Sequence, residues 1–289
     1  MTDGPGRTLR LRAAAKINLY LHVTGRRDDG YHLLDSLIVF TGLADELDLA
    51  PAAGMALSVE GEFAGKAGAL EDNLVLRAAH ALARAAGIER GMSARLLKNI
   101  PAAAGLGGGS ADAAAALKGL MRLWDIPAGS LDLPALALAL GADVPVCLDG
   151  HPSFIGGIGE SIEPAPRLPG AGLLLVNPGV ELATPAVFAR RRGGFSPPGR
   201  FSDAPANAAG LAALLADRGN DLTEAAIALA PVVGDVLAAL AAAPGCHLAR
   251  MTGSGATCFG LFDDEATAAA AAARMRRDGW WVQPSRIAS

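Results

Sequence analysis

Aromatic side chains and clustered positive charge are both scarce in this sequence. Phe, Trp and Tyr make up 4% of its 289 residues although hydrophobic residues make up 51%, so Ala, Leu and Val must fill most of the core. Lys and Arg number 25 against 29 Asp and Glu, and they are scattered along the chain. Proteins that bind nucleic acid do so through a concentrated basic surface. The composition therefore predicts a compact protein with no nucleic-acid partner.

Paired cysteines and long apolar runs are missing as well. The three cysteines lie far apart without Cys-x-x-Cys spacing, which predicts reduced, buried thiols rather than a disulfide framework or a zinc site. No uncharged apolar run reaches the length of about 18 residues that a membrane span needs. Lys16, Asn18 and His22 interrupt the only early apolar stretch, so we expect no signal peptide. These features predict a cytoplasmic protein without membrane contact.

Glycine, by contrast, is concentrated in one place. Gly105, Gly107, Gly108 and Gly109 occupy four of five consecutive positions, directly ahead of an Ala-rich stretch of helical character. Glycine lacks a Cβ atom and tolerates positive φ, so successive N–H groups can point into one concavity. The start of the following helix adds unpaired N–H donors and the positive end of its dipole. A loop of this kind favours phosphate binding.

Two common phosphate-binding patterns do not fit this loop. A P-loop requires Gly-Lys-Ser or Gly-Lys-Thr after its spacer, and no lysine follows any of these glycines. The dinucleotide pattern Gly-x-Gly-x-x-Gly, counted from Gly105, places Ser110 at its last position, and no suitable acidic residue follows. A glycine-rich turn without a ligand stays open as the alternative.

Apolar spacing predicts a mixture of strands and helices. Strands are expected over residues 9–23, 36–49 (with a break at 41–45), 93–100, 173–176, 247–251 and 257–262. Helices are expected over residues 73–86, 111–124, 131–140, 185–192 and 264–277, with two more in 221–243. Residues 191–207 are rich in Gly, Pro and Ser, which predicts a mobile loop. We expect an α+β fold with a domain boundary near Leu168, giving domains 1–168 and 169–289.

Several segments together resemble one kinase superfamily. Pro-x-x-x-Gly-Leu-Gly-Gly-Gly-Ser-Ala, which begins at Pro101, resembles the phosphate loop of the superfamily that includes galactokinase, homoserine kinase and mevalonate kinase. It is accompanied by Ala-Ala-Lys-Ile-Asn-Leu-Tyr-Leu at 14–21, Asp-Asp-Gly-Tyr-His at 28–32, Gly-Ala-Asp-Val-Pro at 141–145 and Met-Thr-Gly-Ser-Gly-Ala-Thr at 251–257. In this order the segments are similar to the branch that phosphorylates a methylerythritol carried on cytidine diphosphate.

The resemblance implies a fold, a reaction and two cofactors. Members of the superfamily have a ribosomal-S5-like N-terminal domain and a ferredoxin-like C-terminal domain, with the active site in the cleft between them. The implied reaction uses ATP and Mg²⁺ to phosphorylate the 2-hydroxyl of a cytidine diphosphate derivative, a small-molecule substrate in isoprenoid precursor synthesis. The sequence does not predict the oligomeric state or the metal ligands, for which Ser110 is only a weak candidate.

Asp143 and Lys16 are the candidate catalytic residues. Phosphoryl transfer needs a group that positions or deprotonates the acceptor hydroxyl. Asp143 follows a Gly-Ala turn, where an aspartate often only caps a turn or helix, and the resemblance favours the role of catalytic base. Lysine occurs only four times, and Lys16 and Lys98 lie beside the motifs. We predict that Lys16 points inward near Asp143, whereas Lys98 either contacts ATP or is a solvated strand end.

The resemblance assigns the acceptor-binding residues. Tyr31 and Phe188 would stack on the cytosine while His32 would hydrogen-bond its edge; the alternative for Tyr31 is packing beneath a hairpin. Asn18 would position the methylerythritol portion. The acceptor set comprises Asn18, Tyr31, His32, Thr184, Phe188 and Gly253.

The ATP-binding residues are assigned in the same way. Asn73 is similar to an adenosine contact of the family, although Asp-Asn-Leu is also an ordinary helix cap. Gly253, from the acceptor set, would face the active site by the same analogy, and the alternative for it is a tight connection between two strands. The ATP set comprises Asn73, Lys98, Pro101, Gly105, Leu106, Gly107, Gly108, Gly109 and Ser110.

Other functions within the same superfamily stay open at this point. The rivals are another small-alcohol kinase, such as one acting on homoserine, a diphosphomevalonate decarboxylase and a non-catalytic ligand-binding relative. Retention of both Lys16 and Asp143 argues against a binding protein, and the Tyr31–His32 segment argues against a decarboxylase.

Overall fold

The chain is described as a computed structural model over residues 8–66 and 69–288, and it divides into two compact units. The first unit takes in the described residues up to Ala15, Leu43–Ala102 and Gly107–Gly150. The second takes in Lys16–Gly42, Ala103–Leu106 and the chain from His151 onwards. The two long N-terminal strands therefore contribute to both units. The domain boundary near Leu168 stays a prediction.

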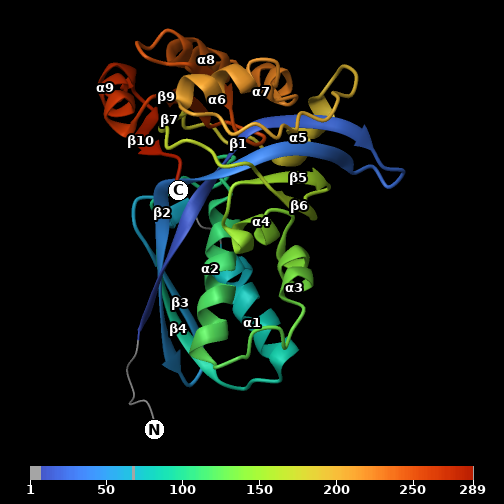
Figure 1. The fold of residues 1–289 in the computed structure, drawn as a ribbon. Coiled ribbons are helices and arrows are strands. Elements are labelled where there is room, and N and C mark those ends of the chain that lie inside the picture. The colour runs from blue at the N-terminus through green and yellow to red at the C-terminus, as the bar shows by residue number, and fades with distance from the viewer. Residues whose placement is uncertain (1–7, 67–68, 289) are drawn as a thin grey trace. The chain divides into compact units, whose positions relative to one another are not determined.

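The first unit combines strands with four helices (Figure 1). Its strands are β3 (Met55–Glu60), β4 (Gly91–Leu97), the first part of β1 (Leu9–Arg26) and the last part of β2 (His32–Ala52). Strand β4 pairs parallel with β3 and antiparallel with β2, from Glu46 opposite Leu97 to Ala52 opposite Gly91. The helices are α1 (Leu74–Ala86), α2 (Gly108–Leu123), α3 (Leu133–Leu140) and α4 (Val144–Asp149).

Small residues let helix α2 approach the strands of the first unit closely. Alanines 113–116 of α2 are buried. A Cβ atom on Gly119 would lie 2.5 Å from Leu49 Cδ1 and 2.8 Å from Leu11 Cδ1. Glycine in a helix interior costs about 1 kcal/mol relative to alanine, and this close packing explains its presence. The scarcity of aromatics is thus matched by a core built from short side chains.

The second unit contains two groups of strands. The first part of β2 pairs antiparallel with β5 (Ser153–Gly157), which pairs with β6 (Ser161–Pro164). A separate antiparallel sheet has the order β10-β7-β9-β8. Its strands are β7 (Gly172–Asn177), β8 (Leu248–Met251), β9 (Cys258–Phe262) and β10 (Trp281–Arg286).

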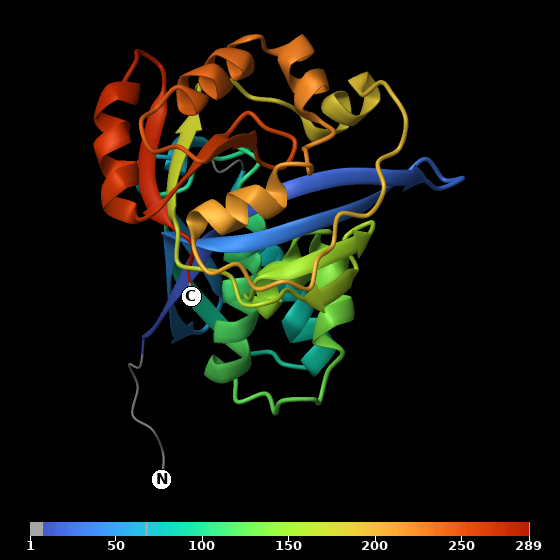
Figure 2. The same cartoon turned by 45° about the horizontal axis from the view of Figure 1, so that its top comes forward.

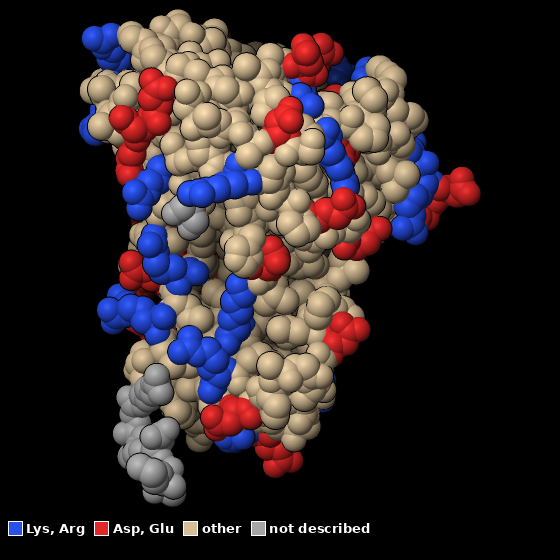
Figure 3. Space-filling view, in the orientation of Figure 1, with Lys and Arg blue, Asp and Glu red and all other residues tan. Residues whose placement is uncertain are grey.

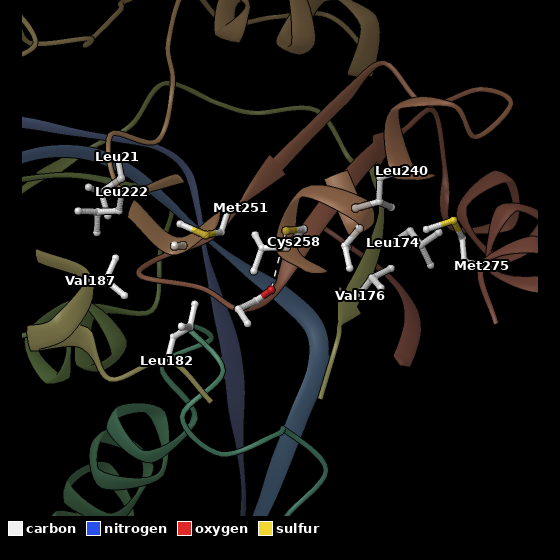
Figure 4. Close-up of a cluster of buried hydrophobic side chains, with 14 of the residues drawn as sticks. Leu21, Leu174, Val176, Leu182, Val187, Leu222, Leu240, Met251, Cys258 and Met275 are labelled. Atoms are coloured by element: carbon white, nitrogen blue, oxygen red, sulfur yellow. Dashed lines mark hydrogen bonds between the residues drawn. The ribbon is translucent and has the colours of Figure 1, made fainter. Parts of the chain in front are cut away.

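Five helices accompany the sheet of the second unit. They are α5 (Thr184–Arg190), α6 (Ala208–Leu215), α7 (Thr223–Leu229), α8 (Val232–Ala241) and α9 (Glu265–Met275). In Figure 2 the red helix α9 runs beside β10 and β7. The core of this unit joins Val176 of β7, Cys258 of β9, Leu240 of α8 and Met275 of α9 (Figure 4). Burial raises the pKa of the Cys258 thiol, so this cysteine is a neutral core side chain.

The α+β prediction is confirmed, with specific corrections. Strand β1 (Leu9–Arg26) and helix α1 are found where expected. The predicted break at 41–45 is wrong, because β2 runs from His32 to Ala52 without interruption. Helix α2 begins at Gly108 rather than at residue 111. Six further elements were not predicted from the sequence: β3, β5, β6, β10, α4 and α6.

Surface charge and helix length agree with the composition. Acidic and basic side chains are mixed over the face drawn in Figure 3, and neither sign covers it alone. Among the residues described, no helix combines the length and apolar character needed to cross a membrane.

Candidate active site

The first half of the glycine loop packs against the turn that contains Gly253. Gly105 has φ +77°, and a Cβ atom there would lie 2.6 Å from the carbonyl oxygen of Thr252. Gly253 has φ +56°, and its Cβ atom would lie 2.9 Å from the carbonyl oxygen of Gly105. The N–H of Lys16 donates to the carbonyl oxygen of Leu106 at 2.9 Å. The second unit therefore brings together three segments that the sequence singled out.

The second half of the glycine loop forms the start of helix α2. Gly107 is its N-cap residue with φ +64°, and Gly108, Gly109 and Ser110 occupy the first turn. The first turn contains no acidic residue, and the first N–H groups of a helix have no partner within the helix. These donors and the positive end of the dipole suit an anion such as a phosphate.

A buried ion-pair cluster lies beneath this first turn. Lys98 Nζ donates to Asp112 Oδ2 at 2.7 Å and also to Asp45 Oδ2. Burial lowers the pKa of Lys98, but the two carboxylates raise it by more, and the net pKa is raised. The alternative of Lys98 as a solvated strand end is therefore wrong, because its side chain is only 5% exposed. Its direct contact with ATP stays a prediction.

The two carboxylates of the cluster have unequal surroundings. Asp45 Oδ1 accepts hydrogen bonds from the N–H groups of Asn99 and Ile100. Asp112 Oδ1 is buried and has no hydrogen-bond partner among the described residues. Burial raises the pKa of Asp112 to about 7, since the opposing effect of Lys98 is smaller and Asp45 adds to the rise. Asp112 is therefore the member of the cluster that holds a proton near neutral pH.

This proton predicts a pH dependence of stability. A free aspartate carboxyl has a pKa of 3.8, whereas that of folded Asp112 is about 7, so the folded state binds the proton more tightly between these values. The contribution of Asp112 to the free energy of unfolding is greatest below pH 4 and falls as the pH rises towards 7. Between pH 5 and 8 we therefore expect the free energy of unfolding to fall as Asp112 loses its proton. Urea unfolding at both pH values should show a smaller loss for Asp112→Asn; an equal loss in both proteins would contradict the prediction.

Lys16 and Asn18 form a buried polar network in the second unit. Lys16 Nζ donates to Asn18 Oδ1 at 2.8 Å, and Asn18 Nδ2 donates to Ser36 Oγ at 2.8 Å. The Asn18 N–H donates to Thr252 Oγ1 at 2.9 Å. Lys16 is 5% exposed and Asn18 is 3% exposed. The inward direction predicted for Lys16 is confirmed, and the network fixes its orientation.

Asp143 belongs to the first unit, at the connection between α3 and α4. It is the N-cap residue of α4, but its side chain accepts no hydrogen bond from the N–H groups of that helix. A side-chain cap of α4 by Asp143 is therefore not formed, whereas the alternative of a turn cap stays open. Because Asp143 and Lys16 belong to different units, their predicted proximity stays a prediction. Asn73, in contrast, does cap α1, since its Oδ1 accepts from the Val75 N–H at 2.9 Å.

The aromatic candidates lie in the second unit. The rings of His32 and Phe188 stack with centroids 5.0 Å apart and an interplanar angle of 26°. Tyr31 is 62% exposed, so the alternative of packing beneath a hairpin is wrong. Burial, followed by the charges of Arg26 and Arg191, lowers the pKa of His32 and keeps its imidazole neutral at pH 7. A neutral imidazole offers one donor and one acceptor.

Thr184, the remaining acceptor candidate, contacts a serine of the Gly253 turn. Its Oγ1 lies 2.8 Å from Ser254 Oγ, within hydrogen-bonding distance. The hydroxyl pair links the start of α5 to the turn after β8. Thr184 and Gly253 are therefore parts of one local arrangement in the second unit.

A buried carboxylate that was not predicted from the sequence holds residues 191–207 in place. Asp35 accepts from Tyr20 Oη at 2.7 Å, from the Gly199 N–H at 2.7 Å and from Arg200 Nε at 2.8 Å. Residues 191–207 contain no helix or strand, as predicted, and side chains of the strands bind their backbone. His22 Nδ1 also lies 2.8 Å from the Pro197 carbonyl oxygen. An aspartate directly before the predicted strand 36–49 was the available signal.

Metal ligands are not apparent from the protein side chains. Within residues 8–66 and 69–288, no group of three or more His, Cys, Asp or Glu side chains is arranged to hold a metal ion.

Comparisons with known proteins cover nearly the whole chain. Residues 73–151 match the family model for the GHMP kinases N terminal domain, and residues 203–279 match the model for GHMP kinases C terminal. A protein of Paramagnetospirillum magneticum is 54% identical over 96% of this chain and 98% of the relative. One of Rhodospirillum rubrum is 50% identical over 95% of this chain and 91% of the relative. Both relatives are named 4-diphosphocytidyl-2-C-methyl-D-erythritol kinase.

Solved structures of kinases are also similar to this chain. A crystal structure of 4-(cytidine 5'-diphospho)-2C-methyl-D-erythritol kinase matches with a TM-score of 0.80 and 35% identity, covering 97% of this chain and 100% of that chain. Homoserine kinase from Cytophaga hutchinsonii matches with a TM-score of 0.72 over 99% of this chain and 97% of that chain. Its identity is 18%, so the likeness concerns the fold alone.

Proposed function

Because the chain belongs to the GHMP kinase family, it is an ATP-dependent kinase, and we propose that it phosphorylates the 2-hydroxyl of 4-diphosphocytidyl-2-C-methyl-D-erythritol. The products are the 2-phosphate and ADP, in isoprenoid precursor synthesis. The observation that carries this proposal is the identity of 50–54% over nearly the full length with relatives named for this activity. Family membership also confirms the predicted superfamily fold.

The proposed mechanism gives each half of the glycine loop and each polar cluster a role. The N–H groups at the start of α2 bind the phosphates of ATP. Asp143 accepts the proton of the 2-hydroxyl as that oxygen attacks the γ-phosphorus. Lys16 offsets the charge that develops during transfer, and the bond to Asn18 orients its ammonium group.

Mg²⁺ enters this proposal as part of the nucleotide substrate. It would offset the charge of the transferred phosphoryl group and would be held mostly by phosphate oxygens and water. Ser110 is the candidate for a ligand from the protein. We also propose a cytoplasmic location, which the buried Cys258 thiol supports because reduced thiols are usual there.

The direct test is to incubate the purified protein with MgATP and the proposed acceptor and to follow phosphorus resonances. A new phosphomonoester signal with matching ADP formation is expected. Homoserine serves as the competing acceptor in a parallel reaction. Phosphorylation of homoserine alone, or ATP left intact by folded protein, would contradict the proposal.

The aromatic residues predict a specific kinetic effect. Removal of a ring that stacks on a base costs about 1–3 kcal/mol, so Tyr31→Ala should raise the KM for the acceptor roughly 5- to 100-fold. The KM for ATP should stay unchanged. Tyr31→Phe keeps the ring and is the matched control, with a KM near that of the wild type. Equal effects of Tyr31→Ala and Tyr31→Phe would exclude stacking as the role of this residue.

A further inference from the structure

Asp45 is a fully buried carboxylate in the middle of β2, inside the segment where the sequence predicted a break. Its side chain has no exposed surface. Oδ1 accepts from the Asn99 N–H at 2.6 Å and from the Ile100 N–H at 2.9 Å, and Oδ2 accepts from Lys98 Nζ. One aspartate on β2 therefore binds three consecutive residues of the segment after β4. A buried charge with this many donors is costly to remove alone.

A second bond ties the same two segments together. Asn99 Nδ2 donates to the carbonyl oxygen of Ala44 at 3.0 Å. Residues 44–45 and 98–100 are thus joined by side-chain bonds in both directions. This fixes the backbone immediately before Pro101, where the glycine loop begins.

The segment held by Asp45 also supports the far end of the glycine loop. A Cβ atom on Gly108 would lie 3.2 Å from Ile100 Cγ2 and 3.4 Å from Lys98 Nζ. Lys98 Nζ reaches Asp112 in the second turn of α2. The position of the first turn of α2 therefore depends on the 98–100 segment, and that segment depends on Asp45.

We propose that Asp45 is a positioning residue for the nucleotide: it holds residues 98–100, and through them the N–H groups at the start of α2, in place for the phosphates of ATP. This rests on the proposed role of the glycine loop in ATP binding. Donors that are fixed before the ligand arrives lose less entropy on binding, so loss of Asp45 weakens ATP binding. The acceptor-binding residues named above belong to the second unit, and their affinity for the acceptor is expected to be retained.

Asp45→Asn tests this proposal against a matched control. The variant keeps an oxygen for the two N–H groups but places an amide opposite the Lys98 ammonium. Asp48→Asn removes the same charge three residues further along β2, where Asp48 pairs with Arg10 and Arg95 at the surface. Isothermal titration with a non-hydrolysable ATP analogue and Mg²⁺, and separately with the cytidine acceptor, measures both affinities in each full-length variant.

For Asp45→Asn we expect a Kd for the ATP analogue raised tenfold or more, with the Kd for the acceptor within twofold of the wild type. Asp48→Asn should change neither value. An unchanged Kd for the analogue, or equal losses for both ligands, would overturn the positioning role. The proposed function is decided separately, by whether the wild-type protein phosphorylates the acceptor.

Asn99→Ala provides a second variant that perturbs the segment mildly. It removes only the side-chain bond to Ala44, and a single neutral hydrogen bond adds little net stability, so the protein is expected to fold. A Kd for the analogue raised two- to fivefold supports the proposal. An unchanged value in Asn99→Ala, if Asp45→Asn does not fold, counts against it.

Discussion

Asp143→Asn is expected to lower turnover by about 10²–10⁴-fold, the usual contribution of a positioned general base. Asparagine has nearly the same shape but cannot accept the proton of the attacking hydroxyl. The Asp143 side chain does not cap α4, so the substitution removes no helix-capping bond. A loss of this size in a variant that still folds would report on chemistry. ADP formation with saturating substrates measures it.

Two measurements separate this effect from other losses. Thermal unfolding with and without MgATP should give the same shift in the variant as in the wild type, because nucleotide binding stabilises the folded state in proportion to its affinity. Asp149→Asn makes the same charge change at the last residue of α4 and is the matched control. It should retain turnover. A normal turnover in Asp143→Asn would remove Asp143 from the mechanism.

The glycine loop shows which structural features can be predicted from a short stretch of sequence. Glycine content and the Ala-rich run were sufficient to predict a loop followed by a helix, because both follow from backbone freedom and helix propensity over a short stretch. The start of α2 at Gly108 was not predicted. Glycine is a poor helix former. It is suited to this position because Ile100 and Lys98 lie so close to Gly108 that they leave little room for a Cβ atom.

Long-range charge compensation explains the error in β2. Gly42 and Asp45 are poor strand residues, and an unpaired buried aspartate would be costly. Lys98, 53 residues away, supplies the compensating charge. No window of local sequence contains both partners, so the continuity of β2 could not be read from its own residues.

In the candidate site, too, residues within local motifs were predicted, whereas residues that depend on distant partners were not. Residue types at Lys16, Asn18, Tyr31 and Asp143 were identified because they stand in recognisable segments. Asp35 was not identified because its hydrogen-bond partner Arg200 lies 165 residues later in the sequence. Composition predicted the loop character of residues 191–207, but the hydrogen bonds that hold it come from strands distant in sequence.

Gly105→Ala is expected to lower the free energy of unfolding by about 2–5 kcal/mol. A Cβ atom in the left-handed region costs about 1–2 kcal/mol, and Gly105 has φ +77°. The added atom would also lie 2.6 Å from the Thr252 carbonyl oxygen and 2.8 Å from that of Gly255. Both are backbone atoms that cannot turn aside, and forcing a group into a filled space costs about 1–3 kcal/mol. Urea unfolding of the variant and of the wild type measures this difference in the free energy of unfolding.

Gly109→Ala is the matched control within the same loop. Gly109 lies in the first turn of α2, and its Cβ atom would meet only Leu74 Cδ1 at 3.4 Å, an ordinary contact distance. Alanine favours the helix by up to about 1 kcal/mol over glycine, so this variant should be as stable as the wild type or more so. If Gly105→Ala were equally stable, the close approach of the loop to the Thr252–Gly255 turn could not exist in solution. The opposite signs expected for these two glycines follow from their surroundings: Gly105 permits close backbone contact, whereas Gly109 has room for a methyl group in the first turn of α2.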